Sequence, residues 1–227
     1  MSKPLLLDLY CGAGGAVKGY IDAGFDVIGV DIVHQPDYPG RFVQSDAIDM
    51  LRWIAGEREA FAAIHASPPC QADNPLTVGT NASRGWGGDH ASLTTRTVAR
   101  LEHLGIPYVV EQPDGRSPLR RDLRLCGEMF GLGVIRHRHF QLGGGFTMLQ
   151  PQHLVHRGRV RGYRHGVWHD GPYVAAYGNG GGKATVDEMR DAMGIDWTTD
   201  RHALTEAIPP AYTRHIGTAL HWHLEAR

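Results

Sequence analysis

The sequence has few cysteines and lacks the patterns that mark disulfide-rich or zinc-binding proteins. Its three cysteines, Cys11, Cys70 and Cys126, form an odd and sparse set among 227 residues. Such a set argues against a disulfide framework. No C-x-x-C pair occurs, so we expect no structural zinc site and no bound metal.

Long apolar runs, a targeting signal and internal repeats are also missing. No apolar segment approaches the ~20 residues needed to span a bilayer. The N-terminal M-S-K-P-L-L-L-D-L-Y is apolar over too few residues for a signal peptide. We therefore expect a cytoplasmic protein without membrane association, and we favour a monomer.

The charge of the whole chain does not indicate nucleic-acid binding, since the formal net charge is −1. One local stretch does indicate it. Residues 152–169 are basic, and their arginines are Arg157, Arg159, Arg161 and Arg164.

Apolar runs alternate with helix-like segments along the first half of the chain. We expect strands over residues 5–10, 25–30, 42–44, 62–66 and 107–111, and helices over 16–23, 49–56 and 91–104. This alternation predicts an α/β fold with a doubly wound, mostly parallel sheet covered on both faces.

The second half of the chain has a weaker pattern. We expect a helix over 125–132, a strand over 136–142, a helix over 187–192 and a C-terminal helix over 212–224. Between the strand over 136–142 and the helix over 187–192 we expect a small irregular β lobe. The chain is accordingly divided into a catalytic domain (1–142), a basic glycine-rich lobe (143–184) and a segment that returns to the domain (185–227).

The first chemical motif is D-L-Y-C-G-A-G-G, residues 8–15. Glycines after a first strand let a ligand approach backbone N–H groups. The G-x-G-x-x-G pattern of dinucleotide-binding loops fails, because Val17 takes the third glycine's place. Asp31 follows Gly12 by 19 residues, which suits a carboxylate that binds a ribose. A tight turn and a solvated Asp31 are an equal alternative.

The second motif is P-P-C-Q, in which Cys70 follows two prolines at a strand end. Proline fixes φ near −65°, so a rigid turn would hold the sulfur in one pose. The thiolate is the reactive form of cysteine. The alternative is a buried structural cysteine, which is our interpretation of Cys11 and Cys126.

Two further motifs carry charge. Glu111 in V-V-E-Q-P ends an apolar strand, so we expect poor hydration, a raised pKa and a general-acid role. The alternative is a solvent-facing strand terminus. Arg136 and Arg138 in R-H-R-H-F share one strand face and could hold a carboxylate or a base carbonyl. The alternative is an exposed basic edge strand.

Asp31, Asp46, Cys70 and Glu111 all fall at the expected carboxyl ends of strands. In open parallel sheets, ligands bind at this edge. The sequence therefore predicts one active site there.

These motifs, in this order, resemble the DNA cytosine carbon-5 methyltransferase family from the glycine loop to the chain end. The resemblance implies the class I methyltransferase fold and S-adenosylmethionine as cofactor. Tyr10 would pack on the adenine, Asp31 would bind the ribose and Asp46 the adenine amino group. E-A-I-P-P, residues 206–210, would close the cofactor site. The expected cofactor residues are Asp8, Tyr10, Gly12, Gly14, Gly15, Asp31, Ile32, Asp46, Pro68, Glu206 and Ala207.

The resemblance also implies the chemistry. Cys70 would attack carbon-6 of a flipped cytosine, protonated Glu111 would meet ring N3, and Arg138, with Arg136, would hold the carbon-2 carbonyl. Gln71 and the four arginines of residues 152–169 would contact DNA.

The sequence departs from the family at several positions. Gln112, Val134 and Glu206 replace residues usual in the family, and A-D-N-P-L follows P-P-C-Q. About sixty residues stand where larger relatives carry a recognition domain, which is similar to compact phage-encoded methylases. A free cytidine nucleotide as substrate, or a catalytically silent binding protein, therefore remain as alternatives.

Overall fold

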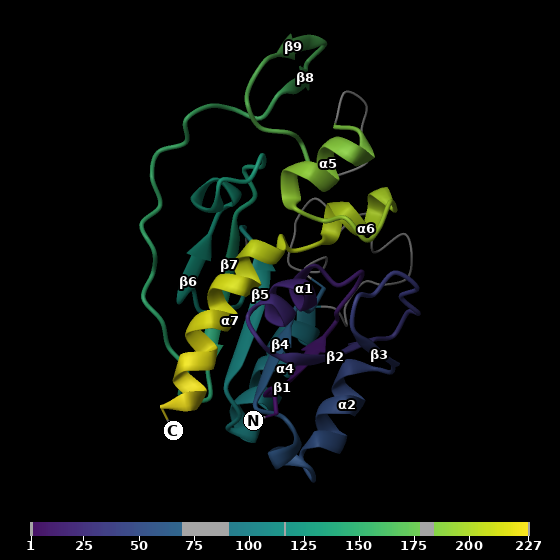
Figure 1. The fold of residues 1–227 in the computed structure, drawn as a ribbon, viewed down its shortest axis with the longest axis vertical. Helices are drawn as coiled ribbons and strands as arrows, with labels where there is room; N and C mark the ends of the chain where they lie inside the picture. Colours follow the sequence, from purple (N-terminus) through teal and green to yellow (C-terminus); the bar gives the residue numbers. More distant parts are fainter. Residues whose placement is uncertain (1, 70–90, 116, 178–183, 227) are drawn as a thin grey trace.

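The computed structural model describes residues 2–69, 91–115, 117–177 and 184–226 (Figure 1). Its centre is a seven-stranded sheet in the order β3-β2-β1-β4-β5-β7-β6. The first five strands are mutually parallel, whereas β7 runs antiparallel to both of its neighbours. The expectation of a doubly wound, mostly parallel sheet is confirmed. The strands are β1 (Leu5–Leu9), β2 (Asp26–Asp31), β3 (Arg41–Gln44), β4 (Ala63–Ala66), β5 (Tyr108–Pro113), β6 (Leu123–Leu125) and β7 (Arg138–Gly143).

Helices cover both faces of this sheet. Helices α1 (Gly15–Asp22) and α7 (Pro210–Glu225) pack on one face, against a cluster that includes Leu6, Tyr20 and Ile216. Helices α2 (Ala47–Ile54) and α4 (Ala91–Leu104) belong to the other face, where Leu7 and Leu51 are buried. Leu6 and Leu7 point to opposite faces because successive side chains of a strand alternate. A strand buried on both sides needs an apolar run, and in β1 only the buried Asp8 interrupts it.

The antiparallel edge of the sheet differs from expectation. A short 3-10 helix, η2 (Gly127–Phe130), replaces the helix expected over 125–132, and β7 begins at Arg138 rather than 136. Strand β6 was not predicted. Its three residues, Leu-Arg-Leu, are too few for an alternating pattern to stand out.

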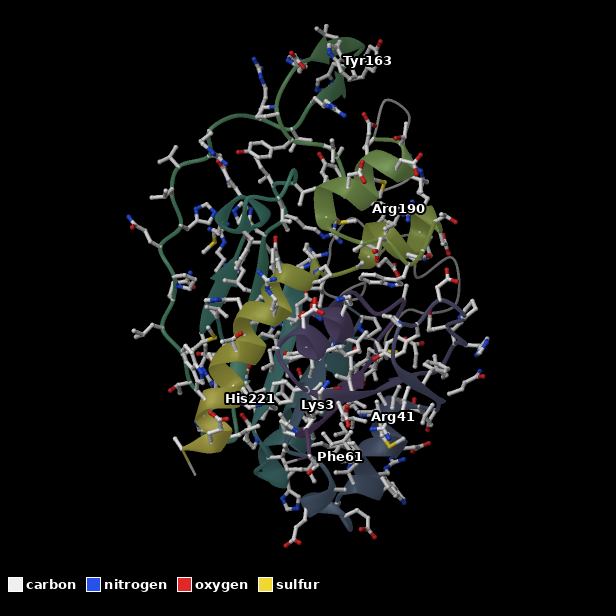
Figure 2. The ribbon with its side chains drawn as sticks, in the orientation of Figure 1. Lys3, Arg41, Phe61, Tyr163, Arg190 and His221 are labelled. Carbon is white, nitrogen blue, oxygen red and sulfur yellow. The ribbon has the colours of Figure 1, made fainter. Side chains whose placement is uncertain are left out.

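The lobe contains one small hairpin, β8 (Gly162–Arg164) and β9 (Val167–His169), after a long irregular path from β7. Figure 1 shows the hairpin apart from the seven-stranded sheet, and Figure 2 shows Tyr163 at its outer end. Helices α5 (Val186–Met193) and α6 (Arg201–Glu206) share an apolar cluster with Val134 and Val174. The division of the chain into three parts stays a prediction.

Most of the other predicted helices begin or end one or two residues from their expected bounds, and one helix was not predicted. Helix α6 was missed, although Asp200 caps it by accepting a hydrogen bond from the His202 amide at 2.8 Å. Helix α7 begins at Pro210 instead of 212, since proline is well suited to a first helical position. Of the described helices, none is long and apolar enough to cross a membrane. A further 3-10 turn, η1, spans Arg58–Ala60.

Candidate active site

The glycine loop joins β1 to α1 and lies against the end of β2. Asp31 Oδ2 accepts a hydrogen bond from the Gly12 amide at 3.0 Å, and Oδ1 accepts one from Val33 at 2.9 Å. Gly12 has a φ of 47°, and a Cβ added there would meet nothing within 4 Å. The loop therefore presents open space beside the Asp31 carboxylate. This arrangement fits a cofactor with a hydroxylated sugar.

The other glycines of the loop allow close packing. A Cβ on Gly14, whose φ is 87°, would lie 2.5 Å from Pro39 Cδ. A Cβ on Gly15 would lie 2.3 Å from the Ile208 carbonyl oxygen. The segment that contains Ala207 and Ile208 therefore lies directly against the glycine loop, although the two are distant in sequence. Trp197 adds a second link, since its Nε1 donates to the Ala13 carbonyl at 2.7 Å.

Asp8 lies behind the loop rather than in it. It is fully buried within β1, and the Tyr38 hydroxyl donates to its Oδ2 at 3.2 Å. Burial, with a smaller contribution from nearby Asp31, raises the pKa of Asp8 to about 8 against the opposing effect of the Tyr38 hydrogen bond. Asp8 therefore lies beneath the loop and presents no exposed carboxylate to a ligand.

Tyr10 and Asp46 flank the same strand ends. The Tyr10 side chain is half-buried, with its hydroxyl 2.9 Å from Thr97 Oγ1 of α4. Asp46 is exposed and caps α2, where its Oδ1 accepts from Ile48 and Asp49 at 2.8 and 3.0 Å. Ile32 is 66% exposed beside Asp31. An exposed isoleucine next to a carboxylate suits a ligand that is part aromatic and part polar.

The P-P-C-Q turn is described as far as Pro69. Cys70 and Gln71 lie outside the described residues. Pro68 is buried, and its carbonyl accepts a hydrogen bond from Gln112 Nε2 at 2.5 Å. The Gln112 side chain, which departs from the family pattern, therefore anchors the start of the turn to β5.

Glu111 lies within β5, which continues to Pro113, and not at its end as expected. The parallel pairing of β4 with β5 ends at Val110, so Glu111 is the first residue beyond it. Its side chain is buried, with Oε1 2.7 Å from Arg138 Nε and a hydrogen bond to the Ser67 side chain. Burial raises the pKa of Glu111, and Arg138, Arg136 and Ser67 offset part of the rise. The raised pKa is confirmed, and a solvent-facing terminus is excluded.

The two arginines have different partners. Arg138 pairs with Glu111, whereas Arg136 donates to the carbonyls of Ala176 and Thr205, each at 2.6 Å. Both are buried, so the exposed edge-strand alternative is wrong. Burial, and to a lesser degree Arg138, lowers the pKa of Arg136 to about 9. Arg136 stays charged at neutral pH and ties the lobe to the segment before α7.

A series of buried hydrogen bonds behind the turn was not predicted from the sequence. Tyr20 Oη lies 3.0 Å from His65 Nδ1, and His65 Nε2 lies 2.9 Å from Ser67 Oγ. Burial lowers the pKa of His65 to about 3, so the ring is neutral. These hydrogen bonds orient Ser67, which in turn contacts Glu111. A single histidine in an apolar strand gives no periodic signal that would have revealed it.

The arginines of residues 152–169 and Glu206 of the E-A-I-P-P motif mostly contact side chains of the protein itself. Arg157 Nε lies 2.7 Å from Glu128, Arg161 is bonded to Glu188, and Arg159 lies 3.4 Å from His169 Nδ1. Arg164 belongs to β8, and its side chain is not described. Glu206 is exposed, 3.6 Å from His202.

Comparison with known proteins yields likeness in structure rather than in sequence. No protein-family model and no curated protein matches the chain. The S. pombe Dnmt2 methyltransferase is 14% identical, with a TM-score of 0.62 over 97% of this chain and 99% of that one. The Entamoeba histolytica methyltransferase EhMeth is 11% identical, with a TM-score of 0.58 over 99% of each chain.

A DNA modification methyltransferase encoded within an E. coli prophage is 20% identical. The match covers 62% of this chain and 46% of that one, with a TM-score of 0.43. The methyltransferase neighbours are consistent with the family resemblance of the motifs. Together with the strand order, they show that the chain has the Rossmann-like fold of the S-adenosylmethionine-dependent methyltransferases.

Proposed function

We propose that this protein is a methyltransferase that transfers a methyl group from S-adenosylmethionine to carbon-5 of cytosine in DNA. The observation that carries the proposal is the buried Glu111–Arg138 pair, which adjoins Ser67 immediately before the P-P-C-Q turn. This pair lies on β5 and β7, and the open glycine loop follows β1 of the same sheet. Both are near the carboxyl ends of the parallel strands. The acid and the cofactor loop thus belong to one edge of one sheet, and the expected thiol of Cys70 would follow the turn that begins there.

The cofactor would be held by residues that the structure brings to the ends of β1, β2 and β3. Asp31 would accept hydrogen bonds from ribose hydroxyls, while Tyr10 and Ile32 would contact the adenine. Gly12 would allow the close approach, Ala207 would close the site from the late segment, and Asp46 would accept from the adenine amino group. When bound, the cofactor supplies an electrophilic methyl group on a sulfonium.

The protein residues would make carbon-5 nucleophilic. Addition of the Cys70 thiolate to carbon-6 breaks the 5,6 double bond, and its electron pair becomes available at carbon-5. Glu111 would give its proton to ring N3 as negative charge develops. Arg138 would hold the carbon-2 carbonyl and orient Glu111. Carbon-5 then forms its bond to the methyl group, and the sulfonium sulfur leaves as a neutral thioether. Loss of the carbon-5 proton to a base or water restores the double bond and expels the Cys70 thiolate, and N3 returns its proton to Glu111.

If DNA is the substrate, the target cytosine has to be flipped out of the duplex before it can react. Flipping costs a few kcal/mol, and phosphate contacts from the basic stretch would offset part of it. Arg159 would contribute most directly, because Arg157 and Arg161 are ion-paired with Glu128 and Glu188. We propose that the protein acts as a monomer in the cytoplasm.

A free cytidine nucleotide is the second candidate substrate. It is favoured by the ion pairs of Arg157 and Arg161 with acidic side chains of the protein, which reduce the charge available for phosphates. The chemistry at Cys70 and Glu111 would be unchanged.

Parallel assays with radiolabelled S-adenosylmethionine separate the candidates. We expect label in duplex DNA and none in dCMP. Label in dCMP alone would reject the DNA substrate. Cys70→Ala should abolish turnover but keep cofactor binding, which isothermal titration measures.

A trap experiment tests catalysis itself. DNA that contains 5-fluorocytosine should form a covalent adduct with the wild type but not with Cys70→Ala, as seen by denaturing electrophoresis. If neither DNA nor the fluorinated nucleotide forms a Cys70-dependent adduct, the silent binding protein becomes the better account.

A further inference from the structure

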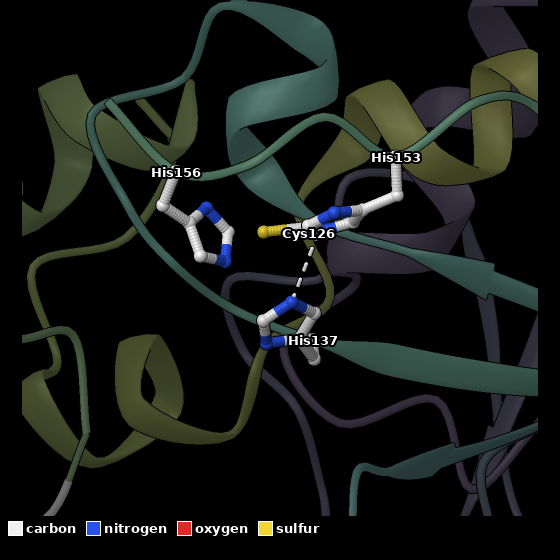
Figure 3. Close-up of side chains that lie close together, drawn as sticks. All are labelled: Cys126, His137, His153 and His156. Atoms are coloured by element: carbon white, nitrogen blue, oxygen red, sulfur yellow. Dashed lines mark hydrogen bonds between the residues drawn. The ribbon is translucent and has the colours of Figure 1, made fainter. Parts of the chain in front are cut away.

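Four potential metal ligands converge at the antiparallel edge of the sheet, outside the proposed methyl-transfer site. Cys126 precedes η2, His137 precedes β7, and His153 and His156 come from the irregular segment 144–161. One donor atom of each residue lies within 4.8 Å of the donor atoms of the others. Figure 3 shows the four side chains grouped around a common point. We propose that these residues bind one Zn²⁺ in a closed Cys-His₃ site.

The donor set and its spacing fit zinc. Zinc is held tetrahedrally by thiolate at about 2.3 Å and imidazole at about 2.0–2.1 Å, which places ligand atoms roughly 3.4–3.6 Å apart. His137 Nε2 and His153 Nε2 are already 3.1 Å apart. The other donor separations are at most 4.8 Å, so each would need to close by no more than about 1.4 Å to reach tetrahedral spacing. Magnesium and calcium prefer oxygen ligands, and this set contains none.

A carboxylate orients one of the ligands. His156 Nδ1 lies 2.6 Å from Glu128 Oε2, so a proton on Nδ1 leaves the Nε2 lone pair for the metal. Such carboxylate–histidine–zinc arrangements fix the ring and its tautomer. Arg157 Nε binds the other Glu128 oxygen at 2.7 Å, which holds the carboxylate in place.

The position of the site indicates a structural role. Four protein ligands leave no open position for a reacting water. Cys126 is fully buried, whereas the three histidines are half-buried at the surface. The metal would fasten the segment 144–161, which exposes Leu149 and Val155 almost completely, to the edge of the sheet. His137 also lies between Arg136 and Arg138, so the metal would fix the backbone beside the proposed active site.

The sequence expectation of no metal depended on the missing C-x-x-C pair, and this proposal opposes it. Cys126, His137 and His153 are 11 and 16 positions apart in the sequence, so they give no compact motif. The only local signal is H-x-x-H at residues 153–156.

Metal content of the purified full chain tests the proposal. We expect about one zinc per chain by inductively coupled plasma mass spectrometry, retained through gel filtration. Cobalt substitution should give tetrahedral d–d absorption and a thiolate-to-cobalt charge-transfer band. The His153→Asn/His156→Asn double variant should lose the zinc, and Glu128→Gln should weaken its affinity about 10- to 100-fold. His103→Asn, at an exposed position in α4, is the matched control and should keep it.

Three results would overturn the proposal. They are a chain without zinc even after incubation with zinc chloride, equal zinc in the double variant and the control, or a cobalt spectrum without the charge-transfer band. Cys126→Ser removes that band if Cys126 is a ligand. Should Cys126→Ser fail to fold by circular dichroism, the half-exposed histidine variants decide the question. None of these measurements depends on methyl transfer.

Discussion

The protonation of Glu111 is controlled by a few neighbouring groups. Burial favours the neutral acid, whereas Arg138, Arg136 and the Ser67 hydroxyl favour the carboxylate. Donation of a proton to ring N3 needs the neutral form. The balance of these opposing contacts therefore sets the pH range in which the proposed reaction can proceed.

Ser67→Ala tests this balance. Because the Ser67 hydrogen bond lowers the pKa of Glu111, its loss should raise that pKa. Methyl transfer falls as pH rises through the pKa of the acid, so the falling limb should move to higher pH by up to about one unit. Single-turnover rates over a pH series measure the limb. Ser117→Ala, whose hydroxyl instead accepts from Leu119, should leave it in place. A limb that stays or moves to lower pH would contradict the assignment.

The raised pKa of the buried Asp8 carboxyl predicts that the stability of the protein depends on pH. Its pKa is raised from 3.8 to about 8, so the folded state binds a proton that the unfolded state has released. This contribution to stability is complete below the unfolded pKa and is lost as pH rises through the folded value. Between about pH 5 and 8 the free energy of unfolding should fall by a few kcal/mol. Asp8→Asn, which keeps an oxygen for Tyr38, should remove most of that fall in urea titrations.

Asp26→Asn is the control for Asp8, since Asp26 is an exposed acid in β2. It should retain the pH dependence of the wild type. A wild-type stability that is constant over this range would show that Asp8 is ionised in the folded protein.

At the scale of elements, the contact of α1 with α7 depends on a glycine. A Cβ on Gly19 would lie 2.1 Å from the Pro210 carbonyl oxygen and 2.1 Å from Thr213 Oγ1. Gly19→Ala should therefore lower the free energy of unfolding by about 1–3 kcal/mol, although alanine favours helix by up to about 1 kcal/mol. Urea unfolding measures the change. In Gly56→Ala the nearest atom would be 3.7 Å away, and stability should be nearly unchanged.

Local patterns in the sequence are sufficient for elements that are long or apolar on both faces. The helix over 91–104 has the predicted bounds, and the runs of β1 and β4 give the parallel core. The pairing of β7 between β5 and β6 could not be predicted, because it joins segments through non-local hydrogen bonds. Strand β5 also continues past Glu111 to Pro113, since β7 supplies antiparallel partners where β4 has ended.

In the candidate site, too, the contacts between residues distant in sequence could not be predicted. Motif order indicated Asp31 and Glu111, and the family resemblance implied that Glu111 and Arg138 act on the same base, whereas their direct ion pair was not predicted. The links from Arg136 to Ala176 and Thr205 and from Tyr20 to His65 join residues 40 to 69 apart, and the chain of contacts then passes from His65 to Ser67, two residues on. Such contacts depend on how layers pack, which no spacing in the sequence encodes.

The charge of the whole molecule bears on its substrate. The chain carries a formal net charge of −1, so attraction to DNA has to come from a local surface. Arg157 and Arg161 are bound to Glu128 and Glu188. Arg159 is exposed, and among its described contacts the polar partner is His169 rather than a carboxylate.

Salt dependence of binding therefore distinguishes the two substrates. For duplex DNA, log K against log salt should have a slope of about −1 to −2, which corresponds to one or two neutralised phosphates. Arg159→Ala should make the slope less negative by about one, whereas Arg52→Ala, paired with Asp49 on α2, should not change it. Fluorescence anisotropy with labelled DNA at several salt concentrations measures both. A slope that Arg159→Ala leaves unchanged would reject this arginine as a phosphate contact. Tight binding of dCMP with DNA binding absent at low salt would favour the nucleotide, because a mononucleotide would need the Glu111–Arg138 pair but no contact from the lobe.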